Sequence, residues 1–204
     1  MFSQIDIFKY ILKKIKKYIF NFFNRFIYLI KKRGINMKLI RPQEKCESQL
    51  MDFKEEFLKN EESVIYGSES LEETENYSEW LESIQSSSSE EPAAEESALT
   101  DVYLGVRNNR VVGIVSVTKE IDESQEGASH INYSVRPSCR CKGCGTKMVK
   151  QALCKAKDIG MEEVQVSIPQ DNIGSIKVIE KNDAELVKSV ENVDEPLNVY
   201  QLKL

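Results

Sequence analysis

The residues best suited to chemistry lie in one short run, Arg136 to Thr146. Gly143 and Gly145 let the backbone turn sharply and come close to a ligand. A helix is predicted to begin near Gly145, so its first N–H groups and its dipole point back into the turn. Arg140 and Lys142 add positive charge. A strand, a glycine turn and a helix N-terminus in this order predict a phosphate cradle, although the glycine spacing fits neither a Walker loop nor a dinucleotide fingerprint.

Three cysteines, Cys139, Cys141 and Cys144, fall in the same run, and Cys154 follows in the predicted helix. Cys154 would lie about 15 Å along the helix from Cys144, too far to share a zinc ion with thiolate bonds of about 2.3 Å. Nothing places Cys46 near them, so we expect no metal and we expect the thiols to fill loop positions. A second interpretation is that the helix N-terminus stabilises the Cys144 thiolate, whose oxidation would then block the cradle.

The elements that must position this run follow from the apolar periodicity. Alternating apolar residues predict a hairpin of strands at 102–106 and 111–117 around a polar turn, followed by a strand at 130–135. Helical spacing predicts helices at 43–60, near 70–84, at 145–158 and at 172–182. Further strands are expected at 38–41, 164–168, 184–190 and 197–202. Strands with single helices between them predict an α/β or α+β sheet layered with helices.

Two segments resemble the cofactor motifs of the GNAT-type N-acetyltransferases. Arg140-x-x-Gly143-x-Gly145, after the strand that ends at Pro137, is similar to the family's acetyl-CoA pyrophosphate motif. The stretch from Asp171 to Asn182 is similar to the second family motif, and the likeness covers most of residues 37–204. The resemblance implies an acetyl-CoA-dependent acyltransferase. It also implies an α/β (α+β) fold, in which a mixed, mostly antiparallel sheet with splayed central strands is flanked by helices.

The resemblance also implies roles for particular residues. The backbone of Tyr133, Ser134 and Val135 would pair with the pantetheine arm between the splayed strands, and an amide there would polarise the thioester carbonyl. Asn172 and Ser175 would contact the same arm. The acceptor amine would attack the thioester directly, with proximity and orientation supplying most of the rate. The pyrophosphate would be held by the amides of Arg140, Cys141, Lys142, Gly143, Cys144, Gly145 and Thr146.

The proton donor and acceptor are less well defined. Many family members carry a tyrosine acid in the second motif, where this chain has Val178 and Ile179. Tyr133 is the alternative acid, and Glu120, near the end of the second hairpin strand, is the candidate base, acting directly or through water. Two structural interpretations stay open: Glu120 as an exposed strand-end carboxylate, and Tyr133 as a half-buried strand residue. His130, the only histidine, is expected to pack or to form a hydrogen bond rather than to catalyse.

Charge divides the chain near residue 36. The net charge of the chain is −5. Residues 1–36 hold nine basic residues and one acidic residue, a net charge of +8, so residues 37–204 have a net charge of −13. This acidic main segment argues against nucleic-acid binding. Twelve Glu and no Lys or Arg lie between Asn60 and Thr100, which favours either a cationic acceptor or a solvated face. Within this segment, the composition of residues 85–98 predicts an acidic low-complexity loop. The sign reverses around the predicted cradle, at Arg136, Arg140, Lys142, Lys147 and Lys150.

Residues 1–36 predict a basic amphipathic helix, because lysines interrupt apolar residues at helical spacing. The lysines exclude a spanning helix, so one hypothesis is contact with an anionic membrane surface. The other hypothesis is a start codon assigned upstream of Met37, since Lys31 to Gly34 requires purine-rich codons that resemble a ribosome-binding site. Five cysteines without a cleavable signal predict a reducing, cytoplasmic compartment, with peripheral membrane association if residues 1–36 are native.

The sequence therefore favours a cytoplasmic N-acetyltransferase domain at residues 37–204 that uses acetyl-CoA and an amine of an unidentified acceptor. A homodimer stays open. The alternative is a catalytically weak fold that binds acyl-CoA as a sensor or interaction module, since the family's tyrosine acid is absent.

Overall fold

The computed structural model describes residues 36–88, 99–122, 124–125, 127–191 and 194–204. The predictions for residues 1–35, and those for residues 89–98 of the acidic loop, lie outside this part of the chain. The chain divides into two compact units, Met1–Asn36 and Met37–Leu204, and the fold described below is that of the second unit. None of the helices in the described ranges is long and apolar enough to cross a membrane.

The described part of the second unit alternates strands with helices, as the periodicity predicts. The elements in chain order are β1 (Met37–Ile40), η1 (Glu44–Cys46), α2 (Glu47–Lys59), α3 (Tyr77–Ser86), β2 (Thr100–Arg107), β3 (Arg110–Thr118), β4 (Ile131–Val135), η2 (Pro137–Cys139), α4 (Cys144–Asp158), β5 (Glu163–Pro169), α5 (Ile173–Glu180), β6 (Glu185–Val190) and β7 (Leu197–Lys203).

The first sheet has the order β1-β2-β3-β4, and each neighbouring pair is antiparallel. Asn108 and Asn109 both have positive φ angles, of 51° and 59°, and form the two-residue turn of the predicted hairpin. Helix α4 packs on one face, where Met148 fills the space that side chains at Gly105 and Gly113 would occupy. Side chains on the opposite face form the main core with α2 and α3, including Leu50, Phe53, Trp80, Leu104 and Ile114.

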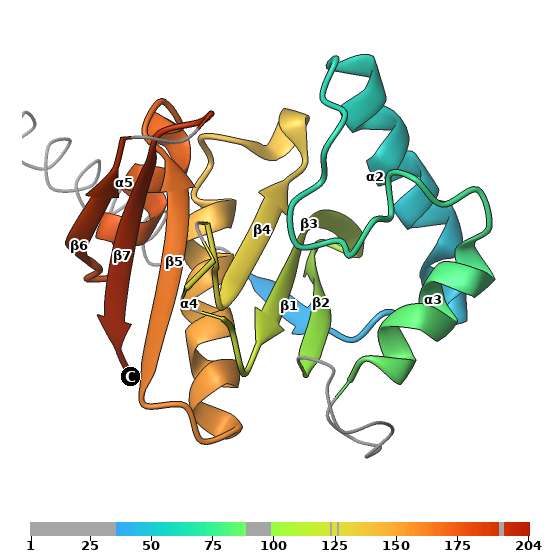
Figure 1. Cartoon of the computed structure of the whole chain (residues 1–204). Helices are drawn as coiled ribbons and strands as arrows, with labels where there is room; N and C mark the ends of the chain where they lie inside the picture. Colours follow the sequence, from blue (N-terminus) through green and yellow to red (C-terminus); the bar gives the residue numbers. More distant parts are fainter. Residues whose placement is uncertain (1–35, 89–98, 123, 126, 192–193) are drawn as a thin grey trace, which may run out of the picture. The chain divides into compact units, whose positions relative to one another are not determined.

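The second sheet has the order β5-β7-β6, again with antiparallel pairing. Strands β4 and β5 run in the same direction and separate toward their carboxyl ends (Figure 1). The two sheets are joined near the start of β4, where His130 N donates to Gln165 O at 2.8 Å and Gln165 N donates to His130 Nδ1 at 3.0 Å. Ser167 N adds a bond to Ser129 Oγ at 3.3 Å. The expected α/β (α+β) class and the splayed central strands are confirmed.

Two expectations about the segment before the hairpin are wrong. The helix expected near residues 70–84 is α3, which begins only at Tyr77. Glu69 and Ser70 have positive φ angles of 51° and 64°, which a right-handed helix excludes, and the Asn76 side chain caps α3 by accepting from Ser78 N. Residues 85–86, the first two of the expected acidic loop, belong to α3 instead.

Candidate functional site

The segment between β4 and α4 is a loop that leads into a helix N-terminus. Cys141 and Gly143 adopt the left-handed conformation, with φ angles of 56° and 77°, and Gly143 is the N-cap of α4. The amides of Cys144, Gly145 and Thr146 lie in the first helical turn, where no carbonyl one turn earlier in the helix is available to them. Left-handed residues directly before a helix N-terminus make an anion-binding concavity. The backbone here is therefore suited to a phosphate group.

Gly145 is the point at which α4, β4 and α5 meet. A Cβ atom at this position would lie 3.2 Å from Val178 Cγ2, 3.4 Å from Val135 Cγ2 and 3.6 Å from Tyr133 Cε2. A distance of 3.2 Å is tighter than ordinary van der Waals contact, so glycine lets the first turn of α4 approach the carboxyl end of β4. The predicted cradle and the predicted strand edge are thereby adjacent.

The edge of β4 that faces away from β3 carries the backbone groups of alternate residues. Arg136 N donates to Val112 O at 2.9 Å, so Arg136 faces β3, and Ser134, two residues earlier, does the same opposite Ile114. Tyr133 and Val135 therefore face the side on which β5 lies. Of the three residues expected to pair with pantetheine, the structure turns the backbone of Tyr133 and Val135 toward the splay and that of Ser134 away from it.

The Tyr133 side chain lies between β4 and the helices α4 and α5. Its hydroxyl is buried and has no hydrogen-bond partner of suitable geometry in the described part of the chain. Burial raises the pKa of Tyr133 to about 12, and the nearby Ser175 side chain opposes that shift only in part. The phenol therefore stays protonated at neutral pH, as a proton donor must.

Comparisons with known proteins agree with this geometry. The family description "Acetyltransferase (GNAT) domain" matches residues 39–185, most of the chain. The chain belongs to the GNAT acetyltransferase family. No curated protein matches the sequence.

Solved structures with the same fold are distant in sequence from this acetyltransferase. The microcin C7 self-immunity acetyltransferase MccE, solved with acetyl-CoA and AMP, is 16% identical with a TM-score of 0.62, over 82% of this chain and 92% of its own. RimL, a ribosomal L7/L12 α-N-protein acetyltransferase in disulfide linkage with coenzyme A, is 14% identical with a TM-score of 0.61, over 82% and 94%. YncA from Salmonella typhimurium, with acetyl-CoA, is 15% identical with a TM-score of 0.54, over 82% and 93%.

Two basic residues expected around the cradle of this GNAT domain point elsewhere. Arg136 is 1% exposed, and its guanidinium donates to Val111 O at 2.9 Å and to Glu56 Oε2 at 2.9 Å. Arg140 directs its guanidinium to Val135 O and Glu62, and its amide donates to Pro137 O at 3.2 Å. Both guanidinium groups are paired with glutamates. These glutamates lie in α2 and in the turn after it, a segment that the sequence did not connect to this loop.

Three of the remaining expected cofactor residues have local roles in the acetyltransferase. Lys142 Nζ donates to Ser138 O at 2.6 Å and stays exposed, so its charge lies on the loop. Asn172 caps α5, because its Oδ1 accepts from Ser175 N at 3.0 Å. Both Asn172 and Ser175 thus lie at the amino end of α5, and Ser175 is near Tyr133.

The remaining candidates for acid and base lie in different surroundings. Glu120 is exposed just beyond the end of β3, and no contact joins it to Tyr133 among the described residues. His130 uses Nδ1 to accept from Gln165 N, which agrees with the expected structural role at the junction of the two sheets. Ile179 is buried and Val178 packs toward Gly145. Because neither side chain has an ionisable group, neither position of the second motif offers a proton.

The cysteines of the loop do not converge. Cys141 is exposed, Cys139 is half-buried, and Cys144 is buried where its Sγ accepts from Arg107 Nη1 at 3.8 Å. The described residues contain no cluster of His, Cys, Asp and Glu that could hold a metal ion. Because the Cys144 sulfur is buried, the structure gives an oxidant no direct access to it.

Sequence reasoning missed Glu56 and Glu62. Glu56 Oε1 accepts from Ser138 N at 2.7 Å, and Glu62 accepts from Arg140. No local pattern identifies them, because charged residues on a helix surface are ordinary and the partners are about eighty residues away in sequence.

Proposed function

We propose that residues 37–204 transfer the acetyl group of acetyl-CoA to an amine by direct attack. The observation that carries this proposal is the meeting of three features at Gly145: the cradle of amides, the strand β4 and the helix α5, which reaches Gly145 through Val178. Pyrophosphate would lie on the amides of residues 141–146. The pantetheine arm would follow the edge of β4, where the backbone of Tyr133 and Val135 faces the splay. The acetyl-CoA complexes of MccE and YncA support this cofactor.

The reaction forms one bond and breaks another. The acceptor arrives as an ammonium ion and loses one proton to a base, so that the nitrogen lone pair can attack the thioester carbonyl carbon. A backbone amide of β4 near Tyr133 would stabilise the developing oxyanion. The C–S bond then breaks, the nitrogen loses its second proton, and the departing thiolate gains a proton. The products are an acetylated amine, free coenzyme A and one released proton.

Tyr133 and Glu120 are the proposed acid and base. The role proposed for Tyr133 is supported by the place of its side chain, which lies near Gly145 at the start of α4. Glu120 is exposed, and it is the first acidic residue after β3, so it would act on an amine that approaches from solvent, directly or through water. Both assignments are tested by the variants described in the Discussion.

The acceptor is proposed to be a cationic amine. The described segment from Glu61 to Ser88 contains glutamates but no lysine or arginine, and its Gly67 packs against the backbone of β4. Such a field attracts cations and lowers the cost of bringing an ammonium group to the site. RimL is described as an acetyltransferase of a protein α-amine, which makes a peptide N-terminus one acceptor to test.

The decisive test has two parts. Calorimetric titration of the full chain with acetyl-CoA is expected to show one site per chain. A panel of polyamines, aminoglycosides and peptides with free N-termini is then assayed for release of free coenzyme A thiol. A chain that does not bind acetyl-CoA would contradict the proposed function outright.

A second candidate function is a catalytically weak module that binds acyl-CoA. The observation that favours it is the apolar pair Val178 and Ile179, which offers no acid from α5. This candidate predicts acetyl-CoA binding without acceleration of thiol release by any amine, whereas the leading proposal predicts acceleration by at least one class of amine.

We also propose a compartment for the protein and a test of membrane contact. All five cysteines are free, which supports a reducing, cytoplasmic compartment. Contact with an anionic membrane surface would depend on residues 1–36, and co-sedimentation of chains beginning at Met1 and at Met37 with anionic vesicles tests it.

A further inference from the structure

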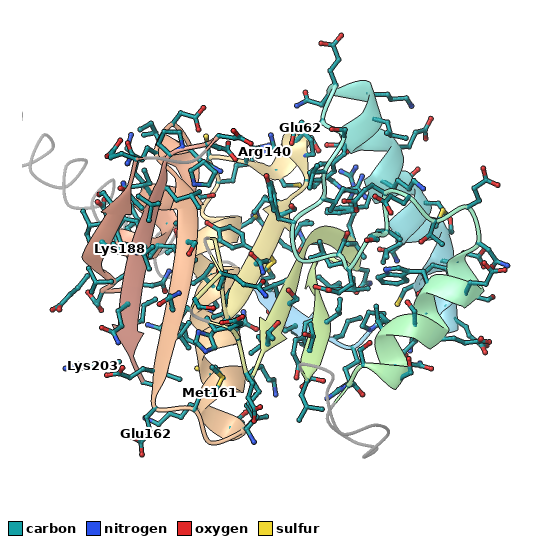
Figure 2. All side chains as sticks on the ribbon, in the orientation of Figure 1. Glu62, Arg140, Met161, Glu162, Lys188 and Lys203 are labelled. Carbon is teal, nitrogen blue, oxygen red and sulfur yellow. The ribbon has the colours of Figure 1, made fainter. Side chains whose placement is uncertain are left out.

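Arg140 is held by three groups: a backbone carbonyl of β4, a carboxylate and an aromatic ring. Its Nε donates to Val135 O at 3.0 Å, which fixes the last carbonyl of β4. Its two terminal nitrogens donate to the two oxygens of Glu62, each at 2.6 Å, a bidentate arrangement. The guanidinium carbon also lies 5.4 Å from the centre of the Phe57 ring. Figure 2 shows Glu62 and Arg140 next to each other near the carboxyl end of β4.

Helix α2, which ends three residues before Glu62, also anchors the loop. Glu56 Oε1 accepts from the backbone of Ser138 at 2.7 Å, while its Oε2 accepts from Arg136. The Arg136 guanidinium lies 5.5 Å from the centre of the Phe53 ring. Helix α2 and the turn after it therefore present two glutamates and two aromatic rings to the segment from Arg136 to Arg140.

We propose that Glu62 is a positioning residue for acetyl-CoA. It acts through Arg140, whose bonds to Glu62 and to Val135 O fix the start of the loop that presents the amides of residues 141–146. This inference rests on the proposed function, since it concerns the same cofactor. Glu62 does not touch the cofactor: its carboxylate would repel a pyrophosphate, and it is neutralised by the arginine that it orients.

The proposal predicts where in the cofactor the effect of Glu62 is felt. When Glu62 no longer holds the guanidinium, the long Arg140 side chain gains rotamer freedom. That freedom is lost again when the ligand binds, so the binding free energy becomes less favourable. The loss then belongs to the pyrophosphate end of the cofactor. Adenosine 3′-phosphate 5′-diphosphate, which contains the pyrophosphate but no pantetheine, should report the same loss as acetyl-CoA.

The test is calorimetric titration of the full chain with acetyl-CoA and with adenosine 3′-phosphate 5′-diphosphate. Glu62→Gln is expected to weaken the binding of both ligands by about ten-fold. This is the size of effect that residues in direct contact, here Glu62 and Arg140, typically have on each other. Glu61→Gln is the matched control, because it removes the same charge from an exposed neighbour outside this contact, and it should leave both affinities unchanged. The measurement is made at a temperature where unfolding experiments show all variants to be folded.

A double-mutant cycle separates action through Arg140 from a general structural effect. If Glu62 acts through Arg140, the chain with both Glu62→Gln and Arg140→Gln binds acetyl-CoA no more weakly than Arg140→Gln alone. The proposal is overturned if the fold losses of affinity in the two single variants multiply in the double variant. An unchanged or tighter affinity in Glu62→Gln overturns it as well. Failure of the wild-type chain to bind acetyl-CoA is a different result, because it contradicts the proposed function itself.

Discussion

The backbone of Gly67 lies directly against the carbonyl oxygen of Asn132. An added Cβ atom would lie 2.2 Å from that oxygen, and the φ angle of Gly67 is +77°. The turn around Gly67 is held by bonds from Trp80 Nε1 to Ser68 O at 2.7 Å and from Ser68 Oγ to Glu72 at 2.7 Å. An ordered turn thus rests on β4, one residue before Tyr133.

Gly67→Ala should therefore destabilise the fold by at least about 2 kcal/mol, because backbone strain and a clash with backbone atoms act together. Gly160→Ala is the control: its φ angle is +84°, but its Cβ would have no neighbour within 4 Å. We expect that control to cost about 1 kcal/mol, from strain alone. Urea unfolding measures both, and equal losses would show that contact with Asn132 is unimportant.

Tyr133→Phe should separate catalysis from stability. Removing a buried hydroxyl that lacks a partner should leave the free energy of unfolding unchanged or raise it by about 1 kcal/mol. If the phenol protonates the leaving thiolate, kcat should fall about 100-fold while acetyl-CoA affinity is retained. Steady-state kinetics with the best acceptor provides the measurement. An unchanged kcat would exclude Tyr133 as the acid.

Glu120→Gln should lower kcat/KM for the acceptor by about ten-fold or more near neutral pH, since the variant removes a base and keeps the size of the side chain. Asp122→Asn is a suitable control, because Asp122 is a nearby exposed carboxylate that accepts from Ser124. If kcat/KM of Glu120→Gln equals that of the wild type over pH 6 to 9, Glu120 is not the base but a solvated residue after the end of the strand.

Gly145→Ala tests whether the first turn of α4 needs glycine for packing or for the ligand. The new Cβ would meet Val178 Cγ2 at 3.2 Å, so some loss of stability is expected. Adding Val178→Ala should relieve that contact. We expect acetyl-CoA affinity to stay reduced by about ten-fold in the double variant, because the Cβ also narrows the approach to the amides. Full recovery of affinity would assign Gly145 to packing alone.

The pH dependence of stability should reveal Glu62. Its hydrogen bonds to Arg140 hold the pKa of Glu62 below the ordinary value of 4.5, so the folded state binds fewer protons than the unfolded state. This stabilisation is complete above pH 4.5 and is lost as the pH falls through the folded pKa. The difference in unfolding free energy between wild type and Glu62→Gln should therefore shrink between pH 6 and pH 3. A difference that stays constant with pH would contradict the ion pair.

Much of the fold could be predicted because its signals are local. The hairpin around Asn108 and Asn109 follows from period-two apolar residues and from residue types that accept positive φ angles. Helix α4 follows from its apolar stripe, and Gly160, with a φ angle of +84°, ends it as expected. The start expected for the helix near residues 70–84 was wrong, since Ser68 forms hydrogen bonds with Glu72 and Trp80 that hold a turn there.

By itself, the sequence determined the family, the order of the elements and the glycine turn before α4, because these depend on spacing within short segments. Only the tertiary structure decided which way the charged side chains point. Arg136 and Arg140 were expected to face a phosphate, but Glu56 of α2 and Glu62 of the turn after it lie close enough to bind them. An arginine is long enough to reach several partners, so its partner is decided by packing between elements that are distant in the chain.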